Sequence, residues 1–252
     1  MRRTDPFFLL LCLALSTMAA SGTGFAAELK VLAANAVKEP LLEVITAFEK
    51  SSGHKVTASF GGTEGVTKRI SGGEVVDIVL VGSTNIDRLI AYGKLAAGSR
   101  ADFARSGVGV AVRAGLAKPD ITSSTAVKDA VLAAKSIAYS SGPSGFYVAD
   151  MLKKMGIADQ IKDKVKQTPS GDQVSDLLAR GEADLGFQQV SELLHRKGVD
   201  YLGPLPADIQ NITIYAAGIH TNAATDAAKA LVKFLTAPEA GAAIRKTGME
   251  PG

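Results

Sequence analysis

The sequence predicts an α/β protein built as two lobes. Short apolar runs typical of strands alternate with amphipathic runs typical of helices, a pattern that favours mostly parallel sheets. Apolar residues make up 46% of the 252 residues, which is enough to fill a sizeable core. The apolar strands expected at residues 108–113 and 212–219 have no helix directly beside them, as expected of strands that carry the chain from one lobe to the other.

The first elements follow from the spacing of their apolar residues. Residues 29–34 are an apolar run typical of a buried strand, and residues 40–51 place apolar side chains at helical spacing. Residues 55–60 alternate between polar and apolar side chains, as in a strand, and lead into a short helix at 66–70. The chain therefore begins with two strand and helix pairs.

The same alternation continues to the end of the chain. Residues 78–81 are an apolar strand. The helix at 86–92 ends at Gly93, and glycine is a residue type that commonly ends helices. After the strand at 108–113 we expect, in order, a helix at 125–134, a strand at 137–138, helices at 145–155 and 173–180, strands at 185–188 and 212–219, and helices at 223–236 and 239–247.

The two strands that have no helix directly beside them, at residues 108–113 and 212–219, divide the chain into lobes. We expect lobe 1 to comprise residues 27–108 and 214–252, and lobe 2 to comprise residues 109–213. Ligands of open α/β sheets bind at the carboxyl ends of the strands. A ligand cleft between the lobes is therefore expected to be lined by the loops that follow Leu32, Phe60, Val81, Ala138 and Phe187.

The N-terminus predicts export. Arg2 and Arg3 precede an apolar run at residues 7–15, and small residues lead to a cleavage site at Ala26, so residues 1–26 are expected to be a signal peptide. The apolar run is shorter than the roughly 20 residues that span a bilayer. We expect a periplasmic protein that does not insert into the membrane after cleavage. Cys12, the single cysteine, lies in the signal, so neither a disulfide nor a thiolate metal site is expected.

Charge and composition exclude several functions. The 28 basic and 25 acidic residues are spread along the chain and Trp is absent, which argues against nucleic-acid binding. His54, His195 and His220 are far apart and have no ligand-like spacing with carboxylates, so no metal is expected. The sequence has neither a nucleophile elbow nor a P-loop, and we expect no cofactor.

Two strand-to-helix turns are typical of anion-binding sites. Residues 59–65 and 139–145 are both rich in glycine and hydroxyl side chains, and each opens a helix. A helix N-terminus presents free N–H groups and a positive dipole end, which together favour an anion. The same residue types also serve as simple helix caps, so each turn alone leaves both interpretations open.

Six segments carry a resemblance to a known family. They are Val31-Leu32-Ala33-Ala34, Ser59-Phe60-Gly61-Gly62-Thr63, Val76-Asp77-Ile78-Val79-Leu80, Pro143-Ser144-Gly145-Phe146-Tyr147, Gly181-Glu182-Ala183-Asp184-Leu185-Gly186 and Phe234-Leu235-Thr236-Ala237-Pro238-Glu239-Ala240. Their order and spacing resemble the periplasmic solute-binding proteins of ABC importers, in particular the molybdate-binding branch. The resemblance implies the type II fold, with a mostly parallel mixed sheet in each lobe and a ligand cleft between them.

The resemblance also implies an anion site of five neutral donors. Two of the five positions have lost the expected hydroxyl: Ala36, beside which Asn35 can donate, and Gln189, where the family has a tyrosine. The other three positions fall on Thr63, Ser144 and Gly171. A lost charge-assisted donor costs about 1.5 to 3 kcal/mol, so the changed donors argue against molybdate and favour a larger organic acid.

Two further residues are candidates for the same site. Arg105 lies just before the expected crossing strand, and its planar guanidinium fits a carboxylate through two hydrogen bonds. Tyr139 ends a strand and either packs in the core or turns its hydroxyl to the cleft.

Two functions agree with these patterns. The favoured one is a binding protein that captures a small anion, such as an oxyanion or a di- or tricarboxylate, for an ABC permease and ATPase. The alternative is an enzyme on the same scaffold, because the resemblance extends to a periplasmic isomerase that interconverts cis- and trans-aconitate by proton transfer. The catalytic residue of such an enzyme stays open. We expect a monomer in either case.

Overall fold

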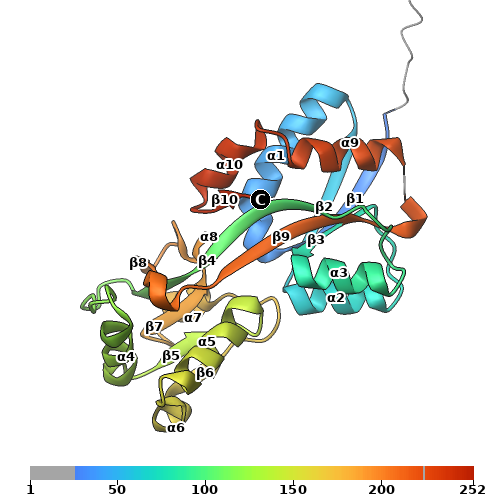
Figure 1. The fold of residues 1–252 in the computed structure, drawn as a ribbon. Coiled ribbons are helices and arrows are strands. Elements are labelled where there is room, and N and C mark those ends of the chain that lie inside the picture. Colours follow the sequence, from blue (N-terminus) through green and yellow to red (C-terminus); the bar gives the residue numbers. More distant parts are fainter. Residues whose placement is uncertain (1–25, 224) are drawn as a thin grey trace, which may run out of the picture.

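The structure, a computed structural model, describes residues 26–223 and 225–252 as two lobes joined by two long strands (Figure 1). The strands are β1 (Glu28–Ala34), β2 (Lys55–Gly61), β3 (Ile78–Gly82), β4 (Ala101–Arg113), β5 (Ile137–Tyr139), β6 (Val165–Gln167), β7 (Leu185–Gln189), β8 (Val199–Pro204), β9 (Ile212–Ile219) and β10 (Glu250–Pro251). They follow the order β2-β1-β3-β9-β4-β7-β5-β6, and β8 and β10 also pair with β4.

The helices alternate with these strands along the chain. They are α1 (Lys38–Ser52), α2 (Thr63–Ser71), α3 (Ser83–Ala91), α4 (Ser124–Ala133), α5 (Pro143–Lys154), α6 (Ala158–Ile161), α7 (Val174–Ala179), α8 (Val190–Leu193), α9 (Asp226–Leu235) and α10 (Ala240–Lys246). Short 3-10 turns lie at Asn35–Val37, Lys162–Lys164, Ala207–Ile209 and Thr221–Ala223. The α/β class predicted from the alternation is confirmed.

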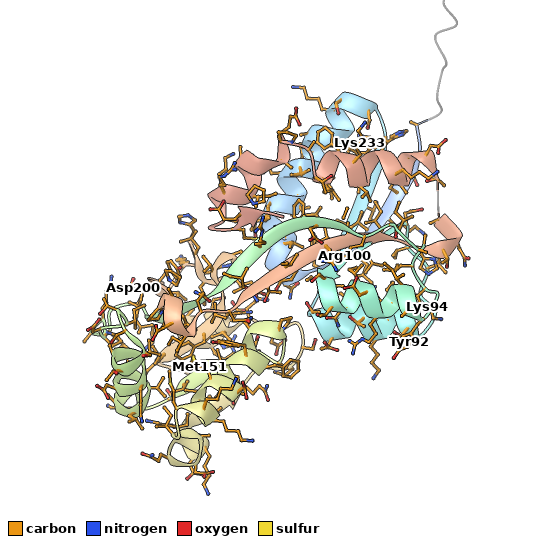
Figure 2. The ribbon with its side chains drawn as sticks, in the orientation of Figure 1. Tyr92, Lys94, Arg100, Met151, Asp200 and Lys233 are labelled. Carbon is orange, nitrogen blue, oxygen red and sulfur yellow. The ribbon has the colours of Figure 1, made fainter. Side chains whose placement is uncertain are left out.

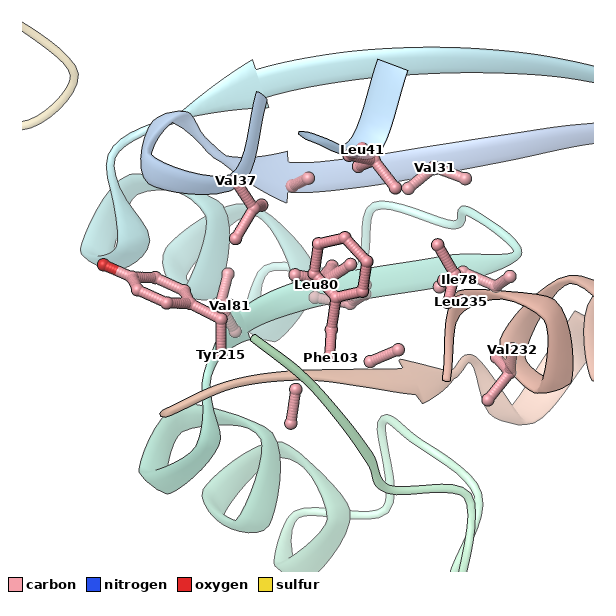
Figure 3. Packing of buried hydrophobic residues seen from close by; sticks show 14 of the residues in the cluster. Val31, Val37, Leu41, Ile78, Leu80, Val81, Phe103, Tyr215, Val232 and Leu235 are labelled. Carbon is pink, nitrogen blue, oxygen red and sulfur yellow. The ribbon is translucent and has the colours of Figure 1, made fainter. Parts of the chain in front are cut away.

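Lobe 1 is a sheet covered by helices on both faces. β1, β2 and β3 run parallel, and β9 runs antiparallel to β3. Helices α1, α9 and α10 lie over one face, and α2 and α3 lie over the other (Figure 1). Leu80, Phe103 and Leu235 come from β3, β4 and α9 and belong to one buried apolar cluster, which Figure 3 shows from close by.

Lobe 2 has a smaller sheet and two buried clusters. β5 runs parallel to β6 and β7, whereas β7 and β8 run antiparallel to β4. The larger cluster includes Val148 and Phe187, and the smaller one includes Leu178 and Leu193. Helix α7 packs closely on β7 because Gly186 has no side chain: a Cβ there would lie 2.6 Å from Val174 Cγ1.

Strand β4 belongs to the sheets of both lobes. Its first half, up to Gly107, pairs with β9, and its second half, from Val108, pairs with β7 and β8. The chain therefore changes lobe within β4, and β9 brings it back into lobe 1. The lobe boundaries at 108, 109, 213 and 214 stay predictions.

Some elements differ from the sequence-based expectation. β4 begins at Ala101 rather than at residue 108. Its first half was missed because the polar residues Asp102, Arg105 and Ser106 interrupt the apolar ones. The short elements α6, β6, α8, β8 and β10 were not predicted, since segments of two to six residues show too little periodicity. The predicted signal peptide lies, except for Ala26, outside the described residues. In the described ranges, no helix is long and apolar enough to cross a membrane.

Candidate functional site

A polar cavity lies between the lobes, at the ends of strands from both. Lobe 1 contributes the turns after β1 and β2, and lobe 2 contributes the turns after β5, β6 and β7. The lining residues are Ala34, Asn35, Ala36, Gly62, Thr63, Ser140, Ser141, Gly142, Pro143, Ser144, Pro169, Ser170, Gly171, Asp172, Gln173, Gln188, Glu192 and Tyr215. Centres of water-sized molecules fit over about 30 Å³, more than the roughly 10–15 Å³ that one water needs.

Direct hydrogen bonds join the lobes around this cavity. Asn35 Nδ2 donates to the Gly171 carbonyl at 2.9 Å, and the Gly65 N–H donates to Ser170 Oγ at 3.3 Å. On another side, Ser191 Oγ donates to the Ala36 carbonyl at 2.7 Å. These bonds link residues more than a hundred positions apart, so the structure represents a closed arrangement of the two lobes.

Two helices begin at the cavity, one from each lobe. α2 starts at Thr63 and α5 starts at Pro143, and in neither case does the residue before the helix cap it with a side chain. In α2 the Gly65 N–H donates to Ser170 Oγ, which leaves the N–H groups before it free of partners within the described chain. Ser140 Oγ and Ser144 Oγ lie 3.3 Å apart, and the Gly142 N–H donates to Ser140 Oγ at 3.3 Å. Ser141 Oγ is buried and has no hydrogen-bond partner among the described residues. Free N–H groups and an unpartnered hydroxyl are groups that an anion can satisfy.

The lining carries acidic groups but, among the described residues, no Lys, Arg or His. Glu192 is only 7% exposed. Burial raises the pKa of Glu192 to about 7, and hydrogen bonding from Gln173 and the charge of Arg196 lower it in part. Burial and the charge of Glu192 raise the pKa of Tyr215 well above its usual value of 10. Charged side chains such as Lys233 and Asp200 instead lie over the outside of the lobes (Figure 2).

Five of the predicted site residues meet at the cavity. They are Asn35, Ala36 and Thr63 from lobe 1 and Ser144 and Gly171 from lobe 2. Their convergence supports their predicted role, which stays a prediction until a ligand is bound. The two predicted anion-binding turns thus face one shared opening.

The other three predicted residues lie outside the lining. Arg105 Nε donates to the Pro251 carbonyl at 3.2 Å, because β4 places this side chain toward β10. Tyr139 packs partly buried against the core of lobe 2. Gln189 is fully buried between the crossing strands, where its side-chain amide lies 3.0 Å from Thr213 Oγ1 of β9.

Glu192 and Tyr215 were not predicted. Glu192 sits in the short helix α8, directly after β7, and Tyr215 sits inside the crossing strand β9. An acidic residue just beyond a strand end that was expected at the cleft is a signal that could have pointed to Glu192. No comparable signal marks Tyr215. No cluster of three or more metal-ligating side chains occurs in the part of the chain that the structure describes.

Two lobes, a shared pair of crossing strands and a polar cavity between facing helix N-termini define a type II periplasmic binding protein. The chain belongs to the family of bacterial extracellular solute-binding proteins, whose family model matches residues 29–250. Membership implies a secreted, periplasmic protein. Related proteins work with ABC transporters as binding proteins for small anions.

Individual relatives fall into two groups. An aconitate isomerase from a Pseudomonas species is 35% identical and is matched over 88% of this chain and 87% of its own length. The molybdate-binding protein ModA of Azotobacter vinelandii is 31% identical over 88% of this chain and 90% of its own length. A solved structure of the periplasmic molybdate-binding protein from A. vinelandii superposes with a TM-score of 0.76 at 24% identity, over 89% of this chain and 99% of that chain. The resemblance noted in the sequence is thus confirmed.

Proposed function

We propose that this protein captures a small organic acid anion, a di- or tricarboxylate, by closing its two lobes around it, and delivers it to an ABC permease and ATPase. The observation that carries the proposal is the interlobe cavity, where two helix N-termini without an N-cap side chain and the unpartnered Ser141 hydroxyl converge. These donors suit an anion because each offers it a hydrogen bond and the helix dipoles add a positive potential.

Closure is expected to depend on the ligand bridging both lobes. Donors from α2 on one side and from α5 on the other replace the ligand's water, and the hydrogen bond from Asn35 to Gly171 forms as the lobes meet. The closed state is populated only to the extent that the ligand binds it better than the open state. The crossing strands β4 and β9 are the segments that would bend.

An organic acid is favoured over a compact oxyanion for two reasons. Two hydroxyl positions of the molybdate-binding branch are replaced here at Ala36 and Gln189, and Gln189 lies outside the lining. Glu192 places a carboxyl in the cavity that can share a proton with a carboxylate ligand.

Thermal unfolding with a panel of anions tests this function. A saturating di- or tricarboxylate, at about a hundred times its Kd, adds about 2.7 kcal/mol of stability, which for a chain of this size corresponds to roughly 5–10 °C in Tm. Molybdate and sulfate are expected to shift Tm less. Arg105→Ala is the control variant and should respond like the wild type, because Arg105 lies outside the cavity lining. No shift with any anion would rule the proposal out.

A second candidate function is the interconversion of cis- and trans-aconitate. It is favoured by Glu192, whose pKa of about 7 suits a base that works near neutral pH. Ionised Glu192 would take a proton from the methylene carbon, the double bond would shift to that carbon, and the same proton would return to the former vinyl carbon. Because the proton that is removed is also the one that is returned, the reaction needs no co-reactant. The relative that is named an aconitate isomerase supports this candidate.

Incubation with each pure isomer tests the second candidate. The enzyme should convert either isomer to the same final ratio, which separation of the two acids after timed samples would show. Boiled protein serves as the control. If both isomers persist unchanged while aconitate still raises Tm, the protein is a binding protein and the isomerase assignment fails.

A further inference from the structure

We propose that capture of an anion in the interlobe cavity takes up one proton, and that the carboxyl of Glu192 is the group that receives it. This inference rests on the proposed function, because it concerns the same cavity and the same class of ligand. It adds a regulation that the family membership does not supply: the affinity for the anion is set by the pH outside the cell membrane.

Glu192 lies where a ligand in the cavity must come close to it. It lines the cavity together with Ser141 and Ser144, and only 7% of it is exposed. The helix that carries it is tied to lobe 1, since the neighbouring Ser191 Oγ donates to the Ala36 carbonyl at 2.7 Å. When the lobes close, the carboxyl is therefore enclosed with the anion.

The groups that face Glu192 do not neutralise it. Arg196, in the turn after α8, directs its Nε to the main-chain oxygen of Glu192 at 3.2 Å, and its charge lowers the pKa of the carboxyl only in part. Tyr215 of β9 faces it as a neutral hydroxyl, because its own pKa is raised well above 10. Asp172 adds a second acidic side chain to the lining, at the turn after β6.

The remaining neighbours of Glu192 are neutral side-chain amides that already form hydrogen bonds with other groups. Gln188 Oε1 accepts from the Val174 N–H at 2.9 Å, and Gln188 Nε2 donates to Gln173 Oε1 at 3.3 Å. Both amides lower the pKa of Glu192 somewhat, but burial outweighs them and holds it at about 7 in the closed structure. A bound anion would raise it further, since two like charges in one small cavity disfavour ionisation.

The sign of the pH effect follows from this order of pKa values. Well below the pKa of the free protein, Glu192 is neutral before and after binding, so the affinity does not depend on its titration. Between that pKa, which burial raises to about 7 in the closed structure, and the higher pKa of the complex, the free protein has lost the proton that the complex keeps. Affinity therefore falls about tenfold per pH unit in that window, and one proton is taken up on binding.

Calorimetric titration of the full mature chain with cis-aconitate tests the inference. Titrations at pH 8 in two buffers of different ionisation enthalpy give the number of protons taken up. The wild type is expected to take up between a half and one proton, whereas Glu192→Gln takes up close to none and binds with a Kd that changes less than about twofold from pH 7 to pH 8. Inorganic sulfate and molybdate are titrated in parallel.

Glu64→Gln is the matched control. Glu64 is also an acidic residue at the cavity-facing start of a helix, but it is held by Asn85 Nδ2 at 3.1 Å and Arg88 at 3.6 Å and does not line the cavity. This variant should take up the same number of protons as the wild type. Equal uptake by the wild type and Glu192→Gln overturns the proton coupling alone. If cis-aconitate, sulfate and molybdate all give no heat of binding, the proposed function is overturned together with the proton coupling.

Discussion

Gly62→Ala is expected to weaken ligand capture by about a hundredfold while both lobes stay folded. Gly62 is the residue before α2, and the closed structure presses it against lobe 2. A Cβ at this position would lie 2.3 Å from Ser170 Oγ, 2.6 Å from the Gly171 nitrogen and 3.0 Å from the Ser170 carbonyl carbon. Two of these are backbone atoms, which cannot rotate away. Overpacking of this kind costs about 1–3 kcal/mol, and the upper value corresponds to a factor of more than a hundred.

The same substitution should not disturb lobe 1 itself. Gly62 has φ −67° and ψ 146°, a conformation that alanine adopts without strain. The penalty therefore appears only when the lobes meet, so Tm without ligand stays close to that of the wild type while Kd rises. Calorimetry with the ligand found in the anion panel measures the change.

Gly61→Ala separates closure from any general effect of a larger side chain. Its Cβ would meet only Val66 Cγ2, at 3.5 Å, which is ordinary contact within lobe 1. This variant should bind the ligand within about threefold of the wild type. Equal affinities for Gly62→Ala and the wild type would mean that ligand binding does not require the closed arrangement of the lobes.

Much of the fold could be predicted because its strands are buried. β3 is an unbroken apolar run and β1 is apolar except at Glu28 and Lys30, since helices cover both faces of their sheet. The bounds of both strands were predicted to within a residue. β4 was predicted to begin seven residues late. In its first half the polar residues Asp102, Arg105 and Ser106 interrupt the apolar ones, a pattern that is less distinct than a continuous apolar run.

The candidate site could be predicted only where it depends on local structure. Thr63 and Ser144 follow strands and open helices, so their place at the cavity follows from the general position of ligands in α/β proteins. The place of Glu192 depends instead on which elements of the two lobes cover it, and a single sequence does not contain that contact. Arg105 was a plausible carboxylate ligand by its chemistry, but its strand register directs it to β10.

The protonation state of Glu192 affects the two candidate functions in opposite directions. An anion is held best when this carboxyl is neutral, whereas removal of a carbon-bound proton requires the ionised form. In a binding protein, the response to pH between 7 and 8 is a loss of affinity alone. In an isomerase, the turnover number would rise over the same interval, because the fraction of ionised base in the complex grows. Measuring affinity and turnover separately therefore distinguishes the two functions at one residue.

Gly145→Ala is expected to destabilise lobe 2 by about 2–4 kcal/mol, even though glycine to alanine in a helix normally stabilises by up to about 1 kcal/mol. Gly145 is the third residue of α5, and a Cβ there would lie 1.5 Å from the Ser140 carbonyl oxygen and 2.4 Å from its carbon. The turn before the helix must move to accept it. That turn holds Ser141 and leads into Ser144, so the cavity is distorted together with the core.

Gly65→Ala provides the matched comparison, because Gly65 is the third residue of α2 in the other lobe. Its Cβ would meet only Ser170 Oγ, at 3.4 Å, so this variant should be as stable as the wild type or more stable by up to about 1 kcal/mol. Urea unfolding of the three ligand-free proteins gives the free energies. If Gly145→Ala unfolds at the same urea concentration as Gly65→Ala, the close approach of Ser140 to α5 does not hold in solution, and the paired hydroxyls of Ser140 and Ser144 lose their structural basis.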